Sequence, residues 1–270
     1  EQVATKPVVG PVAGALFETI ETAAVRQSVH CLCVCPHLRD VAAKVAPKEK
    51  LTVLTDFPLV DPAPATSDIA ERVERAHNDG RLVAAYVGNL EPYQGVGEML
   101  EAMRLMGDDA KKVRLHIYGG PAPMMDELRS RFDDLVKNGS VEFCGSVAVQ
   151  RLGEVLSSSD ILLSPRQVGT NTPMKLYGYL ASGKPVLATS IVSHTQVMTG
   201  DHAELVGPEP AELARGLSRL VQDAKHRDRL GRAGARLVEQ RHSRAAFERT
   251  LTTVYQQIAD LMRSGVDRAN

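Results

Sequence analysis

The sequence predicts an α/β protein whose main part is a doubly wound parallel sheet. From about residue 80 onward, short apolar runs alternate with amphipathic stretches of helical pattern. The apolar runs are "LVAAYVG" (82–88), "VRLHIYGG" (113–120), "VEFCG" (141–145), "DILLSP" (160–165), "PVLATS" (185–190) and "AELVG" (203–207). Strands that are apolar nearly throughout and are separated by helices are typical of a parallel sheet covered on both faces. We therefore expect roughly six strands in one doubly wound sheet.

The first 60 residues predict only a partial second α/β domain. Two helical and two strand patterns occur there: "ALFETIETAAVRQSV" (15–29), "HCLCVCP" (30–36), "HLRDVAAKVA" (37–46) and "LTVLTDFP" (51–58). One or two βα units are too small to cover a parallel sheet of their own. The Pro-rich segment 57–68 is typical of a linker. The chain from Glu209 onward predicts helices, the last from about Ser243 to Met262.

The composition is that of an ordinary globular protein, with 43% hydrophobic and 24% charged residues. A net charge of −1 argues against general nucleic-acid binding, which needs a basic surface. No apolar run approaches the roughly 18–20 residues of a membrane span. We expect no signal peptide, since no charged-then-apolar leader follows Glu1, and the missing initial Met leads us to expect processing or truncation.

The four cysteines suggest no disulfide framework and therefore a reducing cytoplasm. Cys31, Cys33 and Cys35 alternate, so in a strand they face the same side. Their spacing is not that of a zinc finger, which favours packing as small hydrophobes over the alternative of a metal site. The Arg-rich segment 225–244 predicts an exposed helix face, with contact to a membrane surface as its alternative.

Ligands of an open parallel sheet bind at the carboxyl ends of the strands, near the switch in strand order. This rule selects five loops: 88–95, 118–123, 144–148, 164–175 and 188–196. Glycines in such loops let a ligand approach the backbone closely. His194 and His202 follow the fifth strand, where a surface or cap-supporting role is the favoured interpretation.

The fourth of these loops, "SPRQVGTNTPMK" (164–175), is the strongest candidate site. Thr170 or Thr172 can cap a helix whose first residue is Pro173. A helix start presents free backbone N–H groups and a partial positive charge, and such an end binds phosphate.

Arg166 and Lys175 add two cations to this loop, and no Asp or Glu occurs between Asp160 and Asp201. These features predict a site for a diphosphate. The alternative is an ordinary helix start in which Arg166 pairs with a neighbouring carboxylate and Lys175 is solvated. The Walker motif, the dinucleotide-binding glycine motif and the nucleophile elbow are all absent.

The motifs, taken in their order and spacing, resemble a known family. From about residue 80 to the end, the chain resembles the nucleotide-sugar-binding domain of GT-B fold glycosyltransferases and is most similar to the retaining group called family 4. The stretches "YVGNLEPYQGVGEMLEAM", "VRLHIYGG" and "VEFCGSV" stand where the family has its first three strands, and "TPMKLYGYLASGKPVLAT" matches its best-known helix and following strand.

The resemblance implies a division into four segments. The chain would hold a remnant of the acceptor-side Rossmann-like domain at 1–60 and a linker with a lead-in helix at 61–80. The Rossmann-like donor domain would occupy 81–242. A C-terminal helix at 243–270 would pack back toward the N-terminal part.

The resemblance also implies which residues bind a nucleoside-diphosphate sugar. Ser146 and Val147 would lie at the base, and the helix start would contact the phosphates. The implied binding residues are Asn89, Gln94, Gly119, Gly120, Ser146, Val147, Thr170, Asn171, Thr172, Pro173, Met174 and Gly178, with Arg166 and Lys175 as the catalytic cations. No metal is implied, because no acidic metal-binding pair is present near the phosphate loop. No cofactor is implied either, because the nucleotide sugar is a substrate.

Four positions depart from the common pattern of the family. Asn89 and Gln94 stand where relatives often carry an Arg and a Lys. Thr170 and Gly178 stand where relatives often carry glutamates, one for the donor sugar and one for the ribose. Loss of the hydrogen bonds between acid and ribose weakens binding by about 1.5–3 kcal/mol, or roughly ten- to more than a hundredfold. The chain is therefore either a divergent member that holds its donor differently or a degenerate one.

The expected function is transfer of a sugar from a UDP- or GDP-sugar to a hydroxyl acceptor with retention, the acceptor being a glycan, a lipid or a small molecule. The alternative is a non-catalytic module of the same fold that binds a nucleotide or a protein partner. An epimerase or phosphorylase of this fold is a third interpretation. We expect a cytoplasmic location, with the inner face of a membrane as the alternative.

Overall fold

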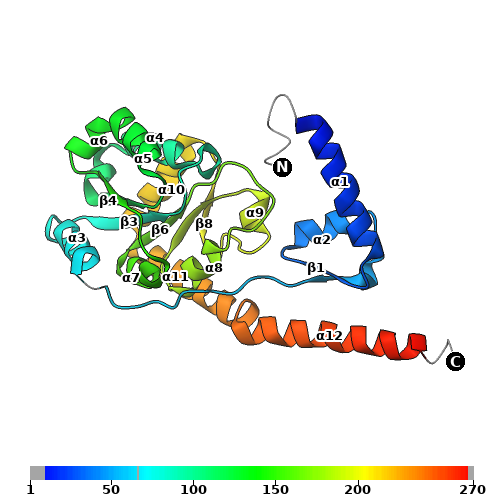
Figure 1. Cartoon of the computed structure of the whole chain (residues 1–270). Coiled ribbons are helices and arrows are strands. Elements are labelled where there is room, and N and C mark those ends of the chain that lie inside the picture. The colour runs from blue at the N-terminus through cyan, green and yellow to red at the C-terminus, as the bar shows by residue number, and fades with distance from the viewer. Residues whose placement is uncertain (1–9, 66, 267–270) are drawn as a thin grey trace. The chain divides into compact units, whose positions relative to one another are not determined.

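The computed structural model describes residues 10–65 and 67–266. The outermost residues of the predicted terminal segments, 1–9 and 267–270, and Thr66 in the predicted linker lie outside the described residues. The chain divides into two compact units (Figure 1). Unit 1 comprises residues 1–55 and 247–270, and unit 2 comprises residues 56–246.

Unit 2 is built on one six-stranded sheet in which all strands are parallel. The strands are β3 (Leu82–Val87), β4 (Val113–Tyr118), β5 (Val141–Gly145), β6 (Ile161–Ser164), β7 (Val186–Thr189) and β8 (Glu204–Val206). Each lies within one of the six predicted runs, which confirms the predicted fold class. Their order in the sheet is β5-β4-β3-β6-β7-β8, so the chain reverses its direction of growth between β3 and β6. That point is the switch at which ligands of such sheets bind.

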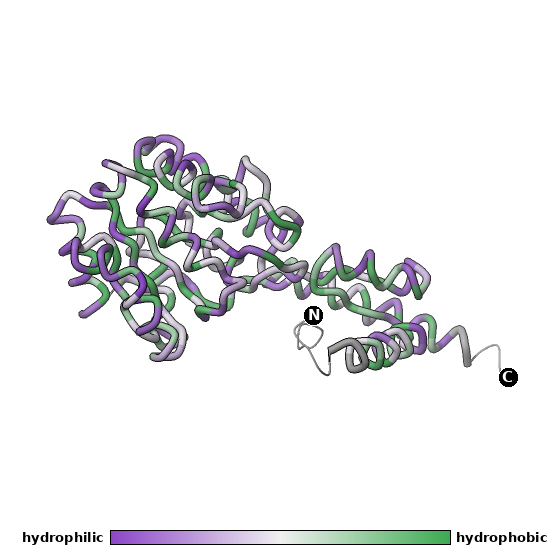
Figure 2. The backbone as a smooth tube through the Cα atoms, turned by 90° about the horizontal axis from the view of Figure 1, so that it is seen from above, coloured by the Kyte–Doolittle hydropathy of each residue, from purple (hydrophilic) through white to green (hydrophobic). Residues whose placement is uncertain are grey.

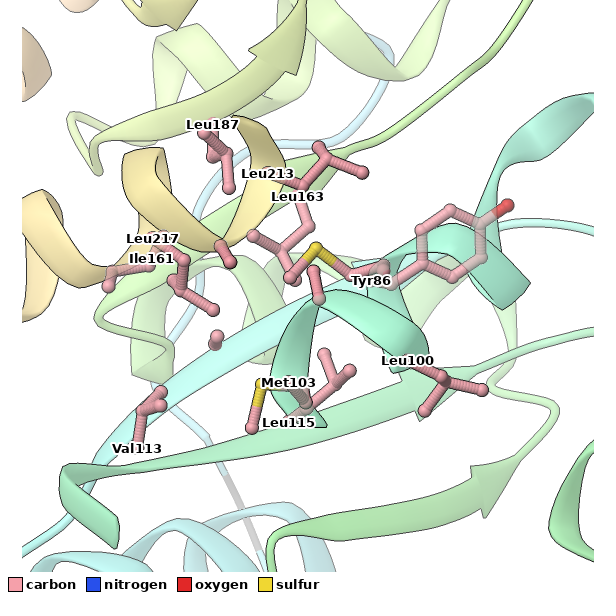
Figure 3. Close-up of a cluster of buried hydrophobic side chains, with 14 of the residues drawn as sticks. Tyr86, Leu100, Met103, Val113, Leu115, Ile161, Leu163, Leu187, Leu213 and Leu217 are labelled. Atoms are coloured by element: carbon pink, nitrogen blue, oxygen red, sulfur yellow. The ribbon is translucent and has the colours of Figure 1, made fainter. Parts of the chain in front are cut away.

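Both faces of this sheet are buried. Successive side chains of a strand point to opposite faces. On β3, Ala84 and Tyr86 belong to one apolar cluster, whereas Ala85 belongs to the other. Figure 3 shows the first cluster, in which side chains of the sheet meet Leu100 and Leu213 from the covering helices. Each fully buried side chain of this size stabilises the fold by roughly 1.5–3 kcal/mol.

Helices cover the two faces of the sheet (Figure 1). The first cluster receives residues from α4 (Val96–Leu105), α5 (Ala122–Arg131), α6 (Asp133–Lys137) and α10 (Pro210–Gln222). The second receives residues from α3 (Ser67–Asn78), α7 (Leu152–Ser158) and α8 (Lys175–Ala181). Helix α11 (Ala224–Arg241) contributes to both, and the short α9 (Val192–Thr195) follows β7. Helices in Figure 2 alternate between purple and green along their turns, as amphipathic helices do.

The amphipathic stretch "MMDELRSRFDDLVKNG" (124–139) ends in Asn-Gly and has the pattern of a single helix, but the structure divides it into two. The chain breaks at Phe132, where φ is −116° and ψ is 33°, so α5 and α6 are separate helices. The Phe132 ring is fully buried in the first cluster, with the guanidinium of Arg104 4.6 Å from its centroid. Because the ring must reach the core, the backbone leaves the helical path there, and Asp133 and Asp134 begin a new helix.

Unit 1 contains helices and a two-stranded parallel sheet. Its elements are α1 (Gly10–Gln27), β1 (Cys31–Cys33), α2 (Pro36–Ala42), η1 (Lys48–Lys50), β2 (Leu51–Val53) and, from Phe247 onward, α12 (Arg244–Val266). Strand β1 pairs with β2, with Cys31 opposite Leu51. A small apolar cluster of Cys33, Ala42, Ala46 and Leu51 forms its core. None of the described helices is both long and apolar enough to span a bilayer.

The alternating cysteines pack as small hydrophobes in this unit. Cys33 and Cys35 are buried, and Cys31 is half-buried. Burial, together with the neighbouring Cys31 thiol, raises the pKa of Cys33 to about 11. Among the described residues, no group of three or more His, Cys, Asp or Glu side chains could hold a metal ion.

His116 on β4 is fully buried, and its ring nitrogens have no hydrogen-bond partner among the described residues. The carboxylate of Glu142 lies 3.9 Å from its Nε2. Burial, reinforced by the charges of Arg114 and Arg72, lowers the pKa of His116 to about 3. The ring is therefore neutral in the folded protein at neutral pH.

This burial makes stability depend on pH. The unfolded His116 takes up a proton near pH 6.5, whereas the folded one does so only near pH 3, so its contribution is lost as the pH falls between these values. We expect His116→Leu to reduce the loss of unfolding free energy between pH 7 and pH 5 by about 1–2 kcal/mol. Urea unfolding at both pH values measures this difference. A variant that keeps the wild-type pH dependence would contradict the neutral buried ring.

Candidate functional site

The loops that follow β3 and β6 meet at the switch point of the sheet. The backbone N–H of Gln167 donates to the carbonyl of Tyr93 at 2.8 Å. Gly95 has a positive φ of 73°, and a Cβ there would lie 1.9 Å from the Pro165 carbonyl oxygen. Only glycine fits this close approach, so residues 88–95 and 164–175 form one continuous surface.

The loop after β4 joins the same surface. The N–H of Gly88 donates to the carbonyl of Tyr118 at 3.0 Å. Gly119 has a φ of 102°, and a Cβ there would lie 2.3 Å from the Gly88 carbonyl oxygen. The predicted binding residues Gly119 and Gly120 thus let two loops pass close to each other, and both have backbone conformations that favour glycine.

Lys175, the first residue of α8, lies between two tyrosine rings. Its Nζ is 4.2 Å from the centroid of Tyr86 and 6.0 Å from that of Tyr179, and it donates to the carbonyl of Val87 at 3.4 Å. Burial lowers the pKa of Lys175 to about 7, and the positive charge of Arg166 adds to this effect. The ammonium is stabilised by ring faces and a carbonyl rather than by a carboxylate.

Arg166 lies in the loop that follows β6. Its Nε donates to the carbonyl of Val168 at 2.8 Å, and its guanidinium lies 5.3 Å from the ring centroid of Tyr93. Within the described part of the chain, neither Arg166 nor Lys175 forms an ion pair. The alternative in which Arg166 pairs with a neighbouring carboxylate is therefore wrong. Two cations with no carboxylate between them attract an anion.

The start of α8 differs from the prediction. The helix begins at Lys175, and Met174 occupies the N-cap position with no side-chain cap. The hydroxyl of Thr172 instead accepts a hydrogen bond from Gln196 Nε2 at 2.9 Å, so it does not cap the helix. The N–H of Leu176 bonds to the carbonyl of Pro173, which uses a donor that the predicted helix end would offer to phosphate. Cations, rather than the helix end, give this site its positive character.

Gln196 and a buried polar network hold the loop 164–175 in place through hydrogen bonds. The sequence indicated neither of them. Gln196 Nε2 also donates to the carbonyl of Thr170 at 2.8 Å. His194 is fully buried, which overturns the favoured surface role. Its Nδ1 lies 2.7 Å from the carbonyl of Thr189, so Nδ1 carries the proton and Nε2 accepts from Ser164 Oγ at 3.1 Å.

The network explains how a neutral histidine supports Arg166. Burial lowers the pKa of His194 to about 4, so the ring stays uncharged at neutral pH. The hydroxyl of Thr189, which touches the same ring, donates to the backbone carbonyl of Arg166. Apart from the His itself, which follows the fifth strand, no motif marks this network, because its members lie far apart along the chain.

The remaining predicted residues lie around this surface with differing exposure. Asn89 is exposed, and its carbonyl accepts a hydrogen bond from the Tyr86 hydroxyl. Gln94 is half-buried, and its Oε1 has no partner among the described residues. Ser146 is exposed and Val147 half-buried after β5, at the edge of the sheet. Val147 packs against the second apolar cluster, to which Leu176 and Tyr179 of α8 belong.

An apolar pocket of about 220 Å³ lies beside Lys175. Strand β3 and helices α7 and α8 line it, and the segment before α3 contributes Leu59. Its wall includes Val87, Leu152, Leu156, Gly178 and Tyr179. One cation therefore borders a pocket whose other side chains are almost all apolar.

The amino-acid pattern of this unit matches the family model described as "Glycosyl transferases group 1" over residues 81–223. The chain belongs to this family. Two characterised relatives are similar in sequence. A phosphatidyl-myo-inositol mannosyltransferase of Mycobacterium leprae is 27% identical over 171 residues, which make up 63% of this chain and 44% of the relative. An exopolysaccharide phosphotransferase of Streptomyces coelicolor is 31% identical over 137 residues, 50% of this chain and 14% of the relative.

Solved structures share the GT-B fold with this member of the family. Anabaena HepE in complex with UDP and glucose has a TM-score of 0.73 at 17% identity, covering 96% of this chain and 70% of HepE. Sucrose-phosphate synthase from Thermosynechococcus elongatus has a TM-score of 0.73 at 18% identity, covering 92% of this chain and 62% of the synthase. The chain spans less than half the length of the two characterised relatives.

The buried network predicts that the Thr189 hydroxyl is needed for stability. Thr189→Val keeps the shape of the side chain but leaves the Arg166 carbonyl without its donor. We expect the free energy of unfolding to fall by about 1–3 kcal/mol. The exposed Thr195 on α9 provides the matched control, and Thr195→Val should change it by less than about 0.5 kcal/mol. Chemical denaturation compares the two, and equal effects would contradict the network.

Proposed function

We propose that the protein binds a nucleoside-diphosphate sugar in unit 2 and transfers the sugar to a hydroxyl acceptor with retention of configuration. The observation that carries this proposal is the pair Arg166 and Lys175, two cations without carboxylate partners at the switch point of the sheet. Family membership supports sugar transfer. The likeness to HepE, which was crystallised with UDP and with UDP-glucose, supports a nucleotide-sugar donor.

In this proposal the two cations hold the diphosphate and stabilise the charge that develops on it as it leaves. Charge-assisted hydrogen bonds contribute roughly 1.5–3 kcal/mol each, and donors aimed at developing charge lower the barrier most. The bond between the anomeric carbon and the diphosphate oxygen breaks while the acceptor oxygen bonds to that carbon. The segment between Asp160 and Asp201 offers no carboxylate as a base, and in this proposal the acceptor proton passes to an oxygen of the leaving diphosphate.

The neighbouring loops complete the proposed donor site. The backbone of Gly119 and Gly120 lies against the loop after β3, where a ligand can approach closely. Ser146 and Val147 are proposed to contact the base. The amides Asn89 and Gln94 replace charged groups, which leaves Arg166 and Lys175 as the cations for the diphosphate. The loop 170–174 is held in shape by Gln196.

Removal of Lys175 tests the site. We expect Lys175→Ala to weaken binding of the UDP- or GDP-sugar that the wild type binds by about ten- to more than a hundredfold, because a charge-assisted hydrogen bond is lost. Lys225 on α11 is exposed and gives the matched control, so Lys225→Ala should bind as the wild type does. Titration calorimetry measures both. Absence of binding by the wild type to every UDP- and GDP-sugar would remove the proposed function.

Turnover distinguishes an enzyme from a non-catalytic module of the same fold. Released UDP or GDP is measured with the full chain and a panel of glycan, lipid and small hydroxyl acceptors. Proton NMR of the product then reports the anomeric configuration. A product with inverted configuration would contradict retention, and donor binding without turnover on any acceptor would favour the non-catalytic alternative.

The lowered pKa of Lys175 predicts a pH dependence of donor affinity. With a pKa of about 7, Lys175 loses its charge as the pH rises, whereas a bound diphosphate favours the charged form. We expect the affinity for the bound UDP- or GDP-sugar to fall between pH 7 and pH 9, by at most tenfold per pH unit. Lys175→Arg, which stays charged, should remove this dependence. Equal pH dependence in both proteins would contradict the role of Lys175.

A further inference from the structure

The apolar pocket beside Lys175 lies where the donor continues past its diphosphate. Lys175 and Gly178 are three residues apart on α8 and therefore lie on one face of the helix. Both line the pocket. A group attached to a diphosphate at Lys175 thus reaches the pocket at Gly178.

The polar groups of this pocket are already occupied. The Tyr179 hydroxyl accepts from the N–H of Val87 at 2.9 Å and donates to the carbonyl of Val87 at 3.3 Å. Lys175 Nζ donates to the same carbonyl. No Asp, Glu, Asn, Gln, Ser or Thr is among the described side chains that line the pocket. A pair of neighbouring sugar hydroxyls would find no side-chain carboxylate or amide there to accept its protons.

This lining favours the nucleoside half of the donor over the transferred sugar. A hexose carries a hydroxyl on nearly every ring carbon, and burying such groups without partners is unfavourable. A nucleoside presents the two apolar faces of its base and a ribose with only two free hydroxyls. An apolar cavity of about 150 Å³ holds benzene, so this larger pocket of about 220 Å³ has room for a planar base.

We propose that this pocket holds the base of the nucleoside through apolar contacts and offers no side-chain hydrogen bond to the ribose hydroxyls, so that 2′-deoxynucleoside diphosphates bind as tightly as their ribose counterparts. The substrate class then includes sugars activated by deoxynucleoside diphosphates. Gly178 is the position that decides this, because it lines the pocket next to Lys175 and contributes no side chain. The inference rests on the proposed donor site.

Matched pairs of nucleotides test the inference. Titration calorimetry of the full chain compares UDP with 2′-deoxy-UDP and GDP with 2′-deoxy-GDP. We expect the two members of the pair that binds to differ by less than fivefold in Kd. A ribonucleotide that binds more than fivefold tighter would overturn the inference while leaving the donor site in place. If no member of either pair binds, the proposed function itself fails, and the inference fails with it.

A substitution at Gly178 adds a second readout. A Cβ at this helical position would lie 3.6 Å from Leu156 Cδ1, an ordinary contact, and the pocket that Gly178 lines leaves space beyond it. We expect Gly178→Glu to create a preference for the ribonucleotide of at least about tenfold, because a carboxylate accepts from the two ribose hydroxyls. Gly178→Ala is the control and should keep the ratio of the wild type. Thermal melting verifies that both fold. A folded Gly178→Glu with an unchanged ratio would overturn the position assigned to the ribose.

Discussion

Burial of the parallel sheet on both faces is the constraint on which the site of this protein depends. Apolar side chains of β3 enter both core clusters, so no polar ligand can reach either face of the strand. Polar groups are confined to the loops beyond the strand ends, and the switch between β3 and β6 brings two of these loops together. Arg166 and Lys175 lie near each other beyond the strand ends, because the buried faces of the sheet exclude charged side chains.

The chemical character of this site comes from two cations, Arg166 and Lys175, that have no carboxylate partner among the described residues. The ammonium of Lys175 rests on tyrosine faces and a backbone carbonyl, and burial brings its pKa down to about 7. An ion pair inside the protein would neutralise the group and leave nothing for a ligand. In the proposed donor site, the diphosphate supplies the missing counter-charge. An apolar pocket lies next to Lys175, and in our proposal it limits which chemical group can follow the diphosphate.

The fold could be predicted from local pattern, and the same pattern selects the loop in which we propose the donor site. The six apolar runs contain the six strands, and the loop 164–175 contains both cations. Local pattern failed where a distant residue decides the outcome. Thr172 stands at a position typical of a helix cap, but its hydroxyl accepts a hydrogen bond from Gln196 instead. The segment 124–139 has the pattern of one helix, but the helix is interrupted at Phe132, whose ring is buried in the core.

The sequence by itself determined the parallel sheet, the family and the absence of acids between Asp160 and Asp201, since periodicity and composition are local properties. Only the tertiary structure decided that Lys175 is stabilised by Tyr86, that His194 is buried and neutral, and that Gly178 opens into an apolar pocket. Burial and electrostatic environment depend on which distant residues surround a group. Those neighbours exist only once the chain has folded.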